Sequence, residues 1–526
     1  MKHLKKVITL VLAVATAFAM ATPAFADNPE SGEFAGGQFS QTPETTIEAT
    51  NLTAGDSIGY FQLVEWDTTT SDWKLTTTGS SCRVTLAELL NGITEAEATT
   101  IATNVTGAGT AMTVSGTTAT ATVAPGLYFL RAASADNNTI YNPAFVSADY
   151  YAGGNSVDLT SAIGSSTVLK KSSVPFDKEV IGSDKFVDVK PGDVIPYKIT
   201  TTVPSYGTQF TNPVFTITDT LSAGLALEGD ITVKYGSATT TESVANVVTI
   251  TKGTPSNGFT VAFDKAYLTG LNGATPEVEI TYSAKVTTEA LENVTYMDNK
   301  AKLTFSDTPT TTKNKDDITR HYTFSIDANM NGQDHGNEKS RELIKIGVDE
   351  KGDDITAFTS WVEGESWTTN TPLGGATFKL TDASGNEWTA ESTAEGYISF
   401  NGLDAGTYTL VETAAPAGYV KDSTSHTVKI TPTYKTGTDE LESYTVTVYG
   451  SSTSTYTISN MSDEEATVET TVDKTSMTFP FVNVKGTELP STGGMGTRIL
   501  YTIGGLMVVA GGVFLAAKKR MSTIEE

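Results

Sequence analysis

The sequence is poor in the residues on which most enzyme active sites depend. Among its 526 residues there is a single cysteine, Cys82, and only four histidines. His3 lies in the basic N-terminal stretch, and His321, His335 and His426 have no cysteine partner and no serine in a nucleophile-elbow context. There is no Walker motif, dinucleotide fingerprint or zinc-ligand cluster. The sequence therefore predicts a protein that is not an enzyme and requires no cofactor.

Positive charge is also scarce, with 35 Lys and Arg against 61 Asp and Glu and a formal net charge of −26. This balance argues against a nucleic-acid partner. One cysteine excludes any intrachain disulfide, so an exported chain would need another source of durability. Short alternating runs such as VFTITDTL and EVEITYSAKV, bounded by Gly, Pro, Asn and Asp, are typical of strands. We expect an all-β fold.

The N-terminus has the features of a secretory signal peptide. Basic MKHLKK precedes the apolar run VITLVLAVATAFAMA, and Ala24-Phe25-Ala26 gives the small-x-small pattern of a cleavage site. Residues 1–26 are therefore predicted to be removed, which leaves a secreted protein that begins near Asp27. The alternative is an uncleaved membrane anchor.

The C-terminal segment, residues 489–526, has three parts in a fixed order. An apolar stretch at 499–517 has about the length of a membrane span, and a basic cluster follows it. Before it stands the motif Leu489, Pro490, Ser491, Thr492 and Gly493. This arrangement resembles the cell-wall sorting signal read by sortases. The resemblance implies that a sortase cysteine attacks the carbonyl of Thr492, cleaves before Gly493, and transfers the chain to an amine, finally on peptidoglycan.

The remaining chain is long enough for about three domains. We expect them at residues 27–171, 172–320 and 321–488, with the polar stretch TPTTTKNKDD at 308–317 as a linker between the second and third.

Segments in each unit resemble backbone pilins of Gram-positive, sortase-assembled pili. The first unit shows this in DSIGYFQLVEWD and GLYFLRA, and the second in VKPGDVIPYKI, ITDTLSAGL and DNKAKLTF. In the third unit PLGGATFKLTD, YTLVETAAPAGY and FVNVKGTELPSTGG resemble the collagen-adhesin B-type domain. The resemblance implies three tandem immunoglobulin-like β-sandwiches in a pilus shaft subunit, with sortase, identical subunits and accessory pilins as partners. It leaves any host ligand open.

The same resemblance implies internal Lys–Asn isopeptide bonds, each promoted by a buried carboxylic acid. In the second unit Lys178, Asp219 and Asn299 each have apolar residues two positions before and after them, so all three are expected to face the core. Such burial is costly unless the groups pair. The alternative is a set of ordinary solvated side chains. We assign Lys178 and Asn299 to the bond and Asp219 to the promoting acid.

In the third unit the corresponding residues are Lys345, Glu412 and Asn483. Glu412 lies in the YTLVETAAPAGY segment, and Asn483 precedes the sorting signal at the family's usual place. Lys345 has the weaker pattern, with Leu343 and Gly347 beside it. The first unit offers no convincing triplet, and we predict no bond there.

A shaft subunit also needs an acceptor lysine between its first two domains, where the family has a Val-Tyr-Pro-Lys segment. Here the sequence reads TVLKK, without the Tyr and Pro, and Lys171 aligns with the family lysine. Lys170 is the second choice, and an ordinary charged linker is the alternative. We expect Lys171 to lie in a flexible polar hinge. The competing function is a single-chain wall-anchored adhesin for host matrix or glycan, although the first unit is small for a ligand-binding region.

Residues 327–338, DANMNGQDHGNE, fit the calcium-loop pattern D-x-[DN]-x-[DN]-G-x5-E. The pattern predicts a Ca²⁺ site without the flanking helices of an EF-hand, and a metal-free Asn- and Gly-rich hairpin is the alternative. The predicted ligands are Asp327, Asn329, Asn331, Gln333 through its backbone carbonyl, and Glu338.

Overall fold

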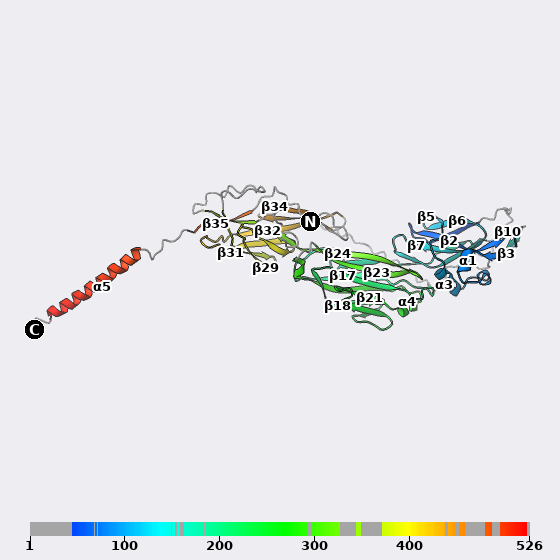
Figure 1. The fold of residues 1–526 in the computed structure, drawn as a ribbon, viewed down its shortest axis with the longest axis horizontal. Coiled ribbons are helices and arrows are strands. Elements are labelled where there is room, and N and C mark those ends of the chain that lie inside the picture. Colours follow the sequence, from blue (N-terminus) through cyan, green and yellow to red (C-terminus); the bar gives the residue numbers. More distant parts are fainter. Residues whose placement is uncertain are drawn as a thin grey trace. The chain divides into compact units, whose positions relative to one another are not determined.

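β-strands are the main secondary structure of the described residues in the computed structural model (Figure 1). The structure describes residues 45–522 apart from 68, 71, 149, 153–154, 158–162, 184, 292–295, 327–342, 349–370, 437–439, 449–451, 458–478 and 487–494. The chain divides into two compact units between Tyr322 and Thr323. The N-terminal compact unit contains two β-sandwiches, here called the first sandwich (45–173) and the middle sandwich (176–322). The C-terminal compact unit contains the third domain (323–486). The all-β prediction is confirmed.

The first sandwich consists of two principal sheets, with one cluster of buried apolar side chains that takes residues from both sheets and a second cluster that takes residues from one sheet and the helices beside it. One sheet has the order β12 (Ser166–Val168), β1 (Thr45–Thr50), β6 (Thr118–Val123), β5 (Thr113–Ser115). The other has the order β3 (Asp72–Leu75), β2 (Ser57–Asp67), β7 (Gly126–Ala133), β9 (Ala144–Ala148), with β4 (Thr110–Ala111) also paired to β2. Two smaller pairs are β8 (Thr139–Tyr141) with β13 (Lys171–Ser173), and β10 (Tyr150–Ala152) with β11 (Asn155–Val157).

Three short helices, which the all-β prediction did not include, lie between β3 and β4. They are α1 (Thr77–Ser81), α2 (Leu86–Leu90) and α3 (Glu95–Asn104). In α2 and α3 a threonine N-cap and the glutamate three residues later satisfy each other's backbone N–H groups. Each of these helices also buries apolar side chains against the second sheet, Leu89 from α2 and Ile101 from α3.

The middle sandwich packs a five-stranded sheet against a six-stranded sheet. The first has the order β14 (Phe176–Val180), β16 (Val194–Thr202), β22 (Glu277–Val286), β18 (Leu225–Tyr235), β19 (Ala238–Thr240). The second has the order β15 (Phe186–Asp188), β24 (Thr311–Tyr322), β23 (Met297–Thr308), β17 (Phe215–Leu221), β21 (Gly258–Phe263), β20 (Val248–Lys252). The connections include α4 (Lys265–Gly270) and a 3₁₀ turn at Thr288–Leu291. Burial alternates along β16, β17, β22 and β23, as expected for strands with one face in the core.

The predicted linker at 308–317 is wrong, because this segment forms the turn and most of β24. β24 pairs antiparallel with β23 along its whole length, from Thr308↔Thr311 near the turn to Met297↔His321 at the open end. Its first residues are exposed and only its last four are buried. A hairpin that projects into water can be polar on both faces, so its composition resembles that of a linker.

The third domain has a six-stranded sheet, a three-stranded sheet and one strand pair. The large sheet has the order β29 (Glu387–Glu391), β28 (Thr377–Asp382), β31 (Gly406–Ala414), β32 (Ser425–Tyr434), β33 (Leu441–Val448), β34 (Ser452–Thr457). The small sheet has the order β27 (Thr371–Pro372), β26 (Leu343–Val348), β35 (Phe479–Val484), and β25 (Phe324–Ile326) pairs with β30 (Phe400–Leu403). β26 and β35, which are distant in sequence, run parallel.

The predicted apolar stretch at 499–517 lies within the helix α5 (Met495–Ser522). Within the part of the chain that the structure describes, no helix meets the length and apolarity needed to cross a membrane.

Candidate functional sites

The middle sandwich brings Lys178, Asp219 and Asn299 together in its core. Lys178 comes from β14 in one sheet, while Asp219 on β17 and Asn299 on β23 come from the other. β17 and β23 are neighbours, and their register pairs Leu221 with Asn299, so Asp219 and Asn299 point to the same face two positions apart. All three side chains are fully buried. A bond from Lys178 to Asn299 would join the two sheets.

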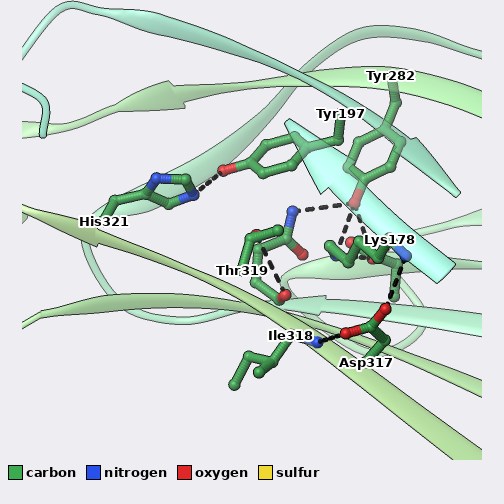
Figure 2. Close-up of polar contacts among 9 residues, drawn as sticks. Lys178, Tyr197, Tyr282, Asp317, Ile318, Thr319 and His321 are labelled. Atoms are coloured by element: carbon green, nitrogen blue, oxygen red, sulfur yellow. Dashed lines mark hydrogen bonds and ion pairs between the residues drawn. The ribbon is translucent and has the colours of Figure 1, made fainter. Parts of the chain in front are cut away.

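The hydroxyl of Tyr282 contacts all three side chains, and Figure 2 shows it beside Lys178. Lys178 Nζ donates to Asp219 Oδ2, and it also donates to Tyr282 Oη at 2.8 Å. Tyr282 Oη donates to Asp219 Oδ2 at 2.8 Å and accepts from Asn299 Nδ2 at 2.9 Å. The amine, the acid and the amide therefore form one hydrogen-bonded cluster.

Burial favours the neutral forms of the amine and the acid. It lowers the pKa of Lys178 to about 8 and raises the pKa of Asp219, although their mutual attraction opposes both shifts. Asp219 Oδ1 and Asn299 Oδ1 are buried acceptors without a hydrogen-bond partner among the described residues. A proton on Asp219 Oδ1 would turn one of these acceptors into a donor. The cluster thus brings together the groups that amide formation needs, an amine, an amide carbon and a carboxyl group, and burial shifts the amine and the acid toward their neutral forms.

The sequence interpretation missed Tyr282. It lies on the inward face of β22, between Ile280 and Ala284 at alternate positions. Its ring stacks on Tyr197 with centroids 5.2 Å apart, and Tyr197 Oη is 2.7 Å from His321 Nε2. The only signal in the sequence is a tyrosine on an apolar face, which an ordinary core tyrosine shows as well.

The third domain brings Lys345, Glu412 and Asn483 together in a different arrangement. Lys345 on β26 and Asn483 on β35 lie on adjacent parallel strands, where the register pairs Lys345 with Phe481 and Gly347 with Asn483. Lys345 Nζ is 3.0 Å from Glu412 Oε1, and Asn483 Nδ2 donates to Glu412 Oε2 at 2.8 Å. All three residues are buried. A bond here would join two neighbouring strands of one sheet.

The acid in this second cluster has a backbone donor in place of a tyrosine. The N–H of Asp422 donates to Glu412 Oε2 at 2.7 Å. Burial lowers the pKa of Lys345, and Glu412 opposes that shift. Asn483 Oδ1 has no hydrogen-bond partner within the described residues.

The expectation of a flexible hinge around Lys171 is wrong. Lys171 begins β13, where it pairs with Tyr141 of β8, and its Nζ donates to Thr53 Oγ1 at 3.0 Å. The physical reason is pairing with a strand about 30 residues earlier, which also buries the neighbouring Ser172. Lys171 and Lys170 are both partly exposed.

Two of the predicted sites lie outside the described residues. One is the sortase motif, Leu489 to Gly493, and the other is the calcium loop with Asp327, Asn329, Asn331, Gln333 and Glu338.

Comparison with known proteins finds two matching families and several similar chains. The family described as SpaA, prealbumin-like fold domain, matches residues 364–445, and the LPXTG cell wall anchor motif matches residues 482–521. The trypsin-resistant surface T6 protein of Streptococcus pyogenes serotype M6 is 25% identical over 448 residues, covering 75% of this chain and 79% of that protein.

Among solved structures, the T6 backbone pilin of serotype M6 Streptococcus pyogenes, described as a modular three-domain structure, matches with a TM-score of 0.54 and 18% identity. The match covers 85% of this chain and all of that one. The chain is therefore a cell-wall-anchored surface protein that carries an LPXTG anchor and a SpaA prealbumin-like domain and has the fold of a Gram-positive backbone pilin.

Proposed function

We propose that this chain is the shaft subunit of a covalent pilus, polymerised by sortase and stabilised by two internal isopeptide bonds. The observation that carries the proposal is the pair of buried Lys–acid–Asn clusters in two separate domains. A buried ion pair contributes little net stability compared with a well-packed apolar core. Two such clusters, each with an amide within hydrogen-bonding reach, are better explained by the chemistry that they allow.

In each cluster the neutral lysine amine attacks the side-chain carbonyl carbon of the asparagine. A C–N bond forms to Lys178 Nζ or Lys345 Nζ, the bond to the asparagine Nδ2 breaks, and ammonia leaves. Asp219 or Glu412 lends a proton to the carbonyl oxygen and recovers it when the tetrahedral intermediate collapses. Because the folded core fixes all three groups, high effective molarity supplies much of the rate without an external catalyst.

Polymerisation would join Thr492 of one subunit to Lys171 of the next. Joining one surface to a different surface of an identical molecule produces an open fibre. The partners are then the sortase, identical subunits, accessory pilins and, at the base, peptidoglycan. Because Lys171 lies at the start of a three-residue strand, its amine must leave Thr53 to enter a sortase cleft.

The cross-links are tested by peptide mass spectrometry of the denatured, digested protein. Each bond should appear as a joined peptide that is lighter by one ammonia, Lys178 to Asn299 and Lys345 to Asn483. Asp219→Ala should remove only the first joined peptide and Glu412→Ala only the second. Unjoined peptides in the wild type would refute the proposed bonds.

Polymerisation is tested on wall extracts, which should show a ladder of high-mass species that survives boiling in detergent. Lys171→Ala should reduce the ladder to monomer while wall anchoring through Thr492 persists. The matched control is Lys170→Ala, which should leave the ladder intact. If Lys170→Ala abolishes the ladder and Lys171→Ala does not, the acceptor is Lys170. If the wild type forms no ladder, the single-chain adhesin is favoured.

A further inference from the structure

One hydroxyl in the middle sandwich touches every group that the proposed reaction needs. Tyr282 Oη lies 2.8 Å from Lys178 Nζ, 2.9 Å from Asn299 Nδ2 and 2.8 Å from Asp219 Oδ2. A tyrosine hydroxyl has one proton to donate and two lone pairs with which to accept. The proton goes to the acid, and the two lone pairs receive the two nitrogens.

These two nitrogens exchange places in the reaction. Lys178 Nζ enters the bond to the asparagine carbon, and Asn299 Nδ2 leaves it. We propose that Tyr282 holds the entering and leaving nitrogens side by side and carries a proton from one to the other, an inference that rests on the proposed Lys178–Asn299 bond.

The proton balance is complete with the groups present. After attack, Nζ carries one proton too many, while Nδ2 needs one more to leave as ammonia. In the tetrahedral intermediate Nδ2 has a lone pair, so the hydroxyl can turn its proton from Asp219 to Nδ2 while Nζ passes a proton to Oη, and Tyr282 ends as it began. Asp219 meanwhile lends its proton to the carbonyl oxygen of Asn299 and recovers it when the intermediate collapses. Burial raises the pKa of Tyr282 well above its ordinary value, which keeps the hydroxyl protonated before and after the transfer.

The ring is held in place by its neighbours. Tyr197 stacks on one side of Tyr282, and Phe259 contacts it edge to face with centroids 4.8 Å apart. Among the described residues of the third domain no tyrosine hydroxyl contacts the cluster; the Asp422 N–H donates to the acid, and the asparagine nitrogen donates directly to Glu412. The inference is therefore made for the middle sandwich alone.

The test is the rate of bond formation in the full chain made by cell-free synthesis. Samples taken over time are denatured and digested, and the Lys178–Asn299 peptide is quantified by mass spectrometry. Tyr282→Phe should slow its appearance by about a hundredfold, the effect of losing a positioned proton-transfer group. The Lys345–Asn483 peptide is the internal reference, because its rate of formation in the same sample should equal that in the wild type.

The matched control is Tyr206→Phe. Tyr206 is another buried tyrosine of the same core, and its hydroxyl donates to the Val214 carbonyl at 3.0 Å, away from the cluster. Melting temperatures of both variants are compared in an Asn299→Ala background, where no bond forms. The two should match there, so that a difference in rate reports on the reaction and not on folding.

A pH profile gives a readout that packing alone would not change. Asp219 faces Lys178 and Tyr282, and the hydrogen bond from Tyr282 lowers the pKa of Asp219. Without that bond the acid stays protonated to higher pH, so the alkaline limit of the reaction should move upward in Tyr282→Phe and stay fixed in Tyr206→Phe.

Two outcomes overturn the inference in distinguishable ways. If the wild type forms no Lys178–Asn299 peptide, both the proposed bond and the relay are wrong. If the wild type forms it and Tyr282→Phe forms it equally fast, or Tyr206→Phe is slowed as much, the bond stands and the relay is wrong.

Discussion

The contribution of the Lys178–Asn299 bond to stability can be worked out from where it ties the chain. The bond closes a loop of roughly 120 residues, and in the chain-entropy treatment of cross-links such a loop destabilises the unfolded state by about 5 kcal/mol. For a domain of this size, each kcal/mol lost from the free energy of unfolding lowers the melting temperature by about 2–4 °C. Loss of the bond should therefore lower the melting temperature of the middle sandwich by about 10–20 °C.

Lys178→Met removes the amine and keeps an unbranched apolar side chain of similar length in the core. The burial that raises the pKa of Asp219 lets this acid remain neutral without its partner. The matched control is Lys198→Met, on the neighbouring strand β16, where a partly exposed lysine pairs with Glu179. Such a surface pair contributes less than about 1 kcal/mol.

Scanning calorimetry and trypsin digestion measure the effect. We expect the middle-sandwich transition of Lys178→Met to fall by the stated amount, with new tryptic sites exposed between 176 and 322, while Lys198→Met resembles the wild type. If the wild type contains the bond and Lys178→Met melts within about 3 °C of it, the loop-closure reasoning is wrong for this domain.

Two further predictions concern a histidine and the calcium loop. Burial lowers the pKa of His321 to about 3, so between its ordinary pKa of 6.5 and pH 3 only the unfolded chain binds the proton and acid destabilises the fold. From pH 7 to pH 5 the free energy of unfolding should fall by about 2 kcal/mol through His321. His321→Gln should lack this part of the fall in denaturant titrations, and an equal dependence of the unfolding free energy on pH in both proteins would contradict the prediction. If the loop at 327–338 binds Ca²⁺, millimolar calcium should raise the melting temperature of the third domain by mass action, and Asp327→Ala should abolish the rise. A flat calorimetric titration would exclude the loop.

Strand alternation explains why the sequence predicted so much of the middle cluster. Lys178, Asp219 and Asn299 interrupt apolar faces, and a two-residue period places each of them inward without knowledge of the sheet order. Lys345 was harder to assign because all six residues of β26 are buried, which leaves no alternation to read.

The features that the sequence did not predict depend on distant partners. Tyr282 looks like any core tyrosine, because its contacts with Lys178, Asp219 and Asn299 arise only when β14, β17 and β23 converge on it. The pairing of Lys171 with β8 and the hairpin at 308–317 likewise involve polar segments, Lys171–Ser173 and residues 308–317, that are ordered by strands elsewhere in the chain. The helices α2 and α3 did carry a local signal, Thr-x-x-Glu at their starts, but each is too short to show helical periodicity clearly.

The position of the middle bond also determines how this domain would respond to tension in a shaft. Load that enters near Lys171 would pass at Lys178 through the bond to Asn299, so residues 179–298 would bear none of it. Residues 300–322 lie beyond the bond, and they belong to the β23–β24 hairpin, whose open end pairs Met297 with His321.

Tension between Asn299 and Tyr322 would first pull Arg320, His321 and Tyr322 away from β15, with which they pair, and would then separate β24 from β23 one pair at a time. This takes less force than shearing a whole sheet. Roughly 23 residues at about 3.5 Å each would release at most about 80 Å. Single-molecule stretching, with handles at residues 171 and 323, should show this short extension in the wild type. Lys178→Met should instead release nearly the whole middle sandwich, about 500 Å for roughly 150 residues. A wild-type extension of that larger size would mean that the load does not pass through the bond, and no extension would mean that contacts beyond the hairpin pairing hold β24 in place.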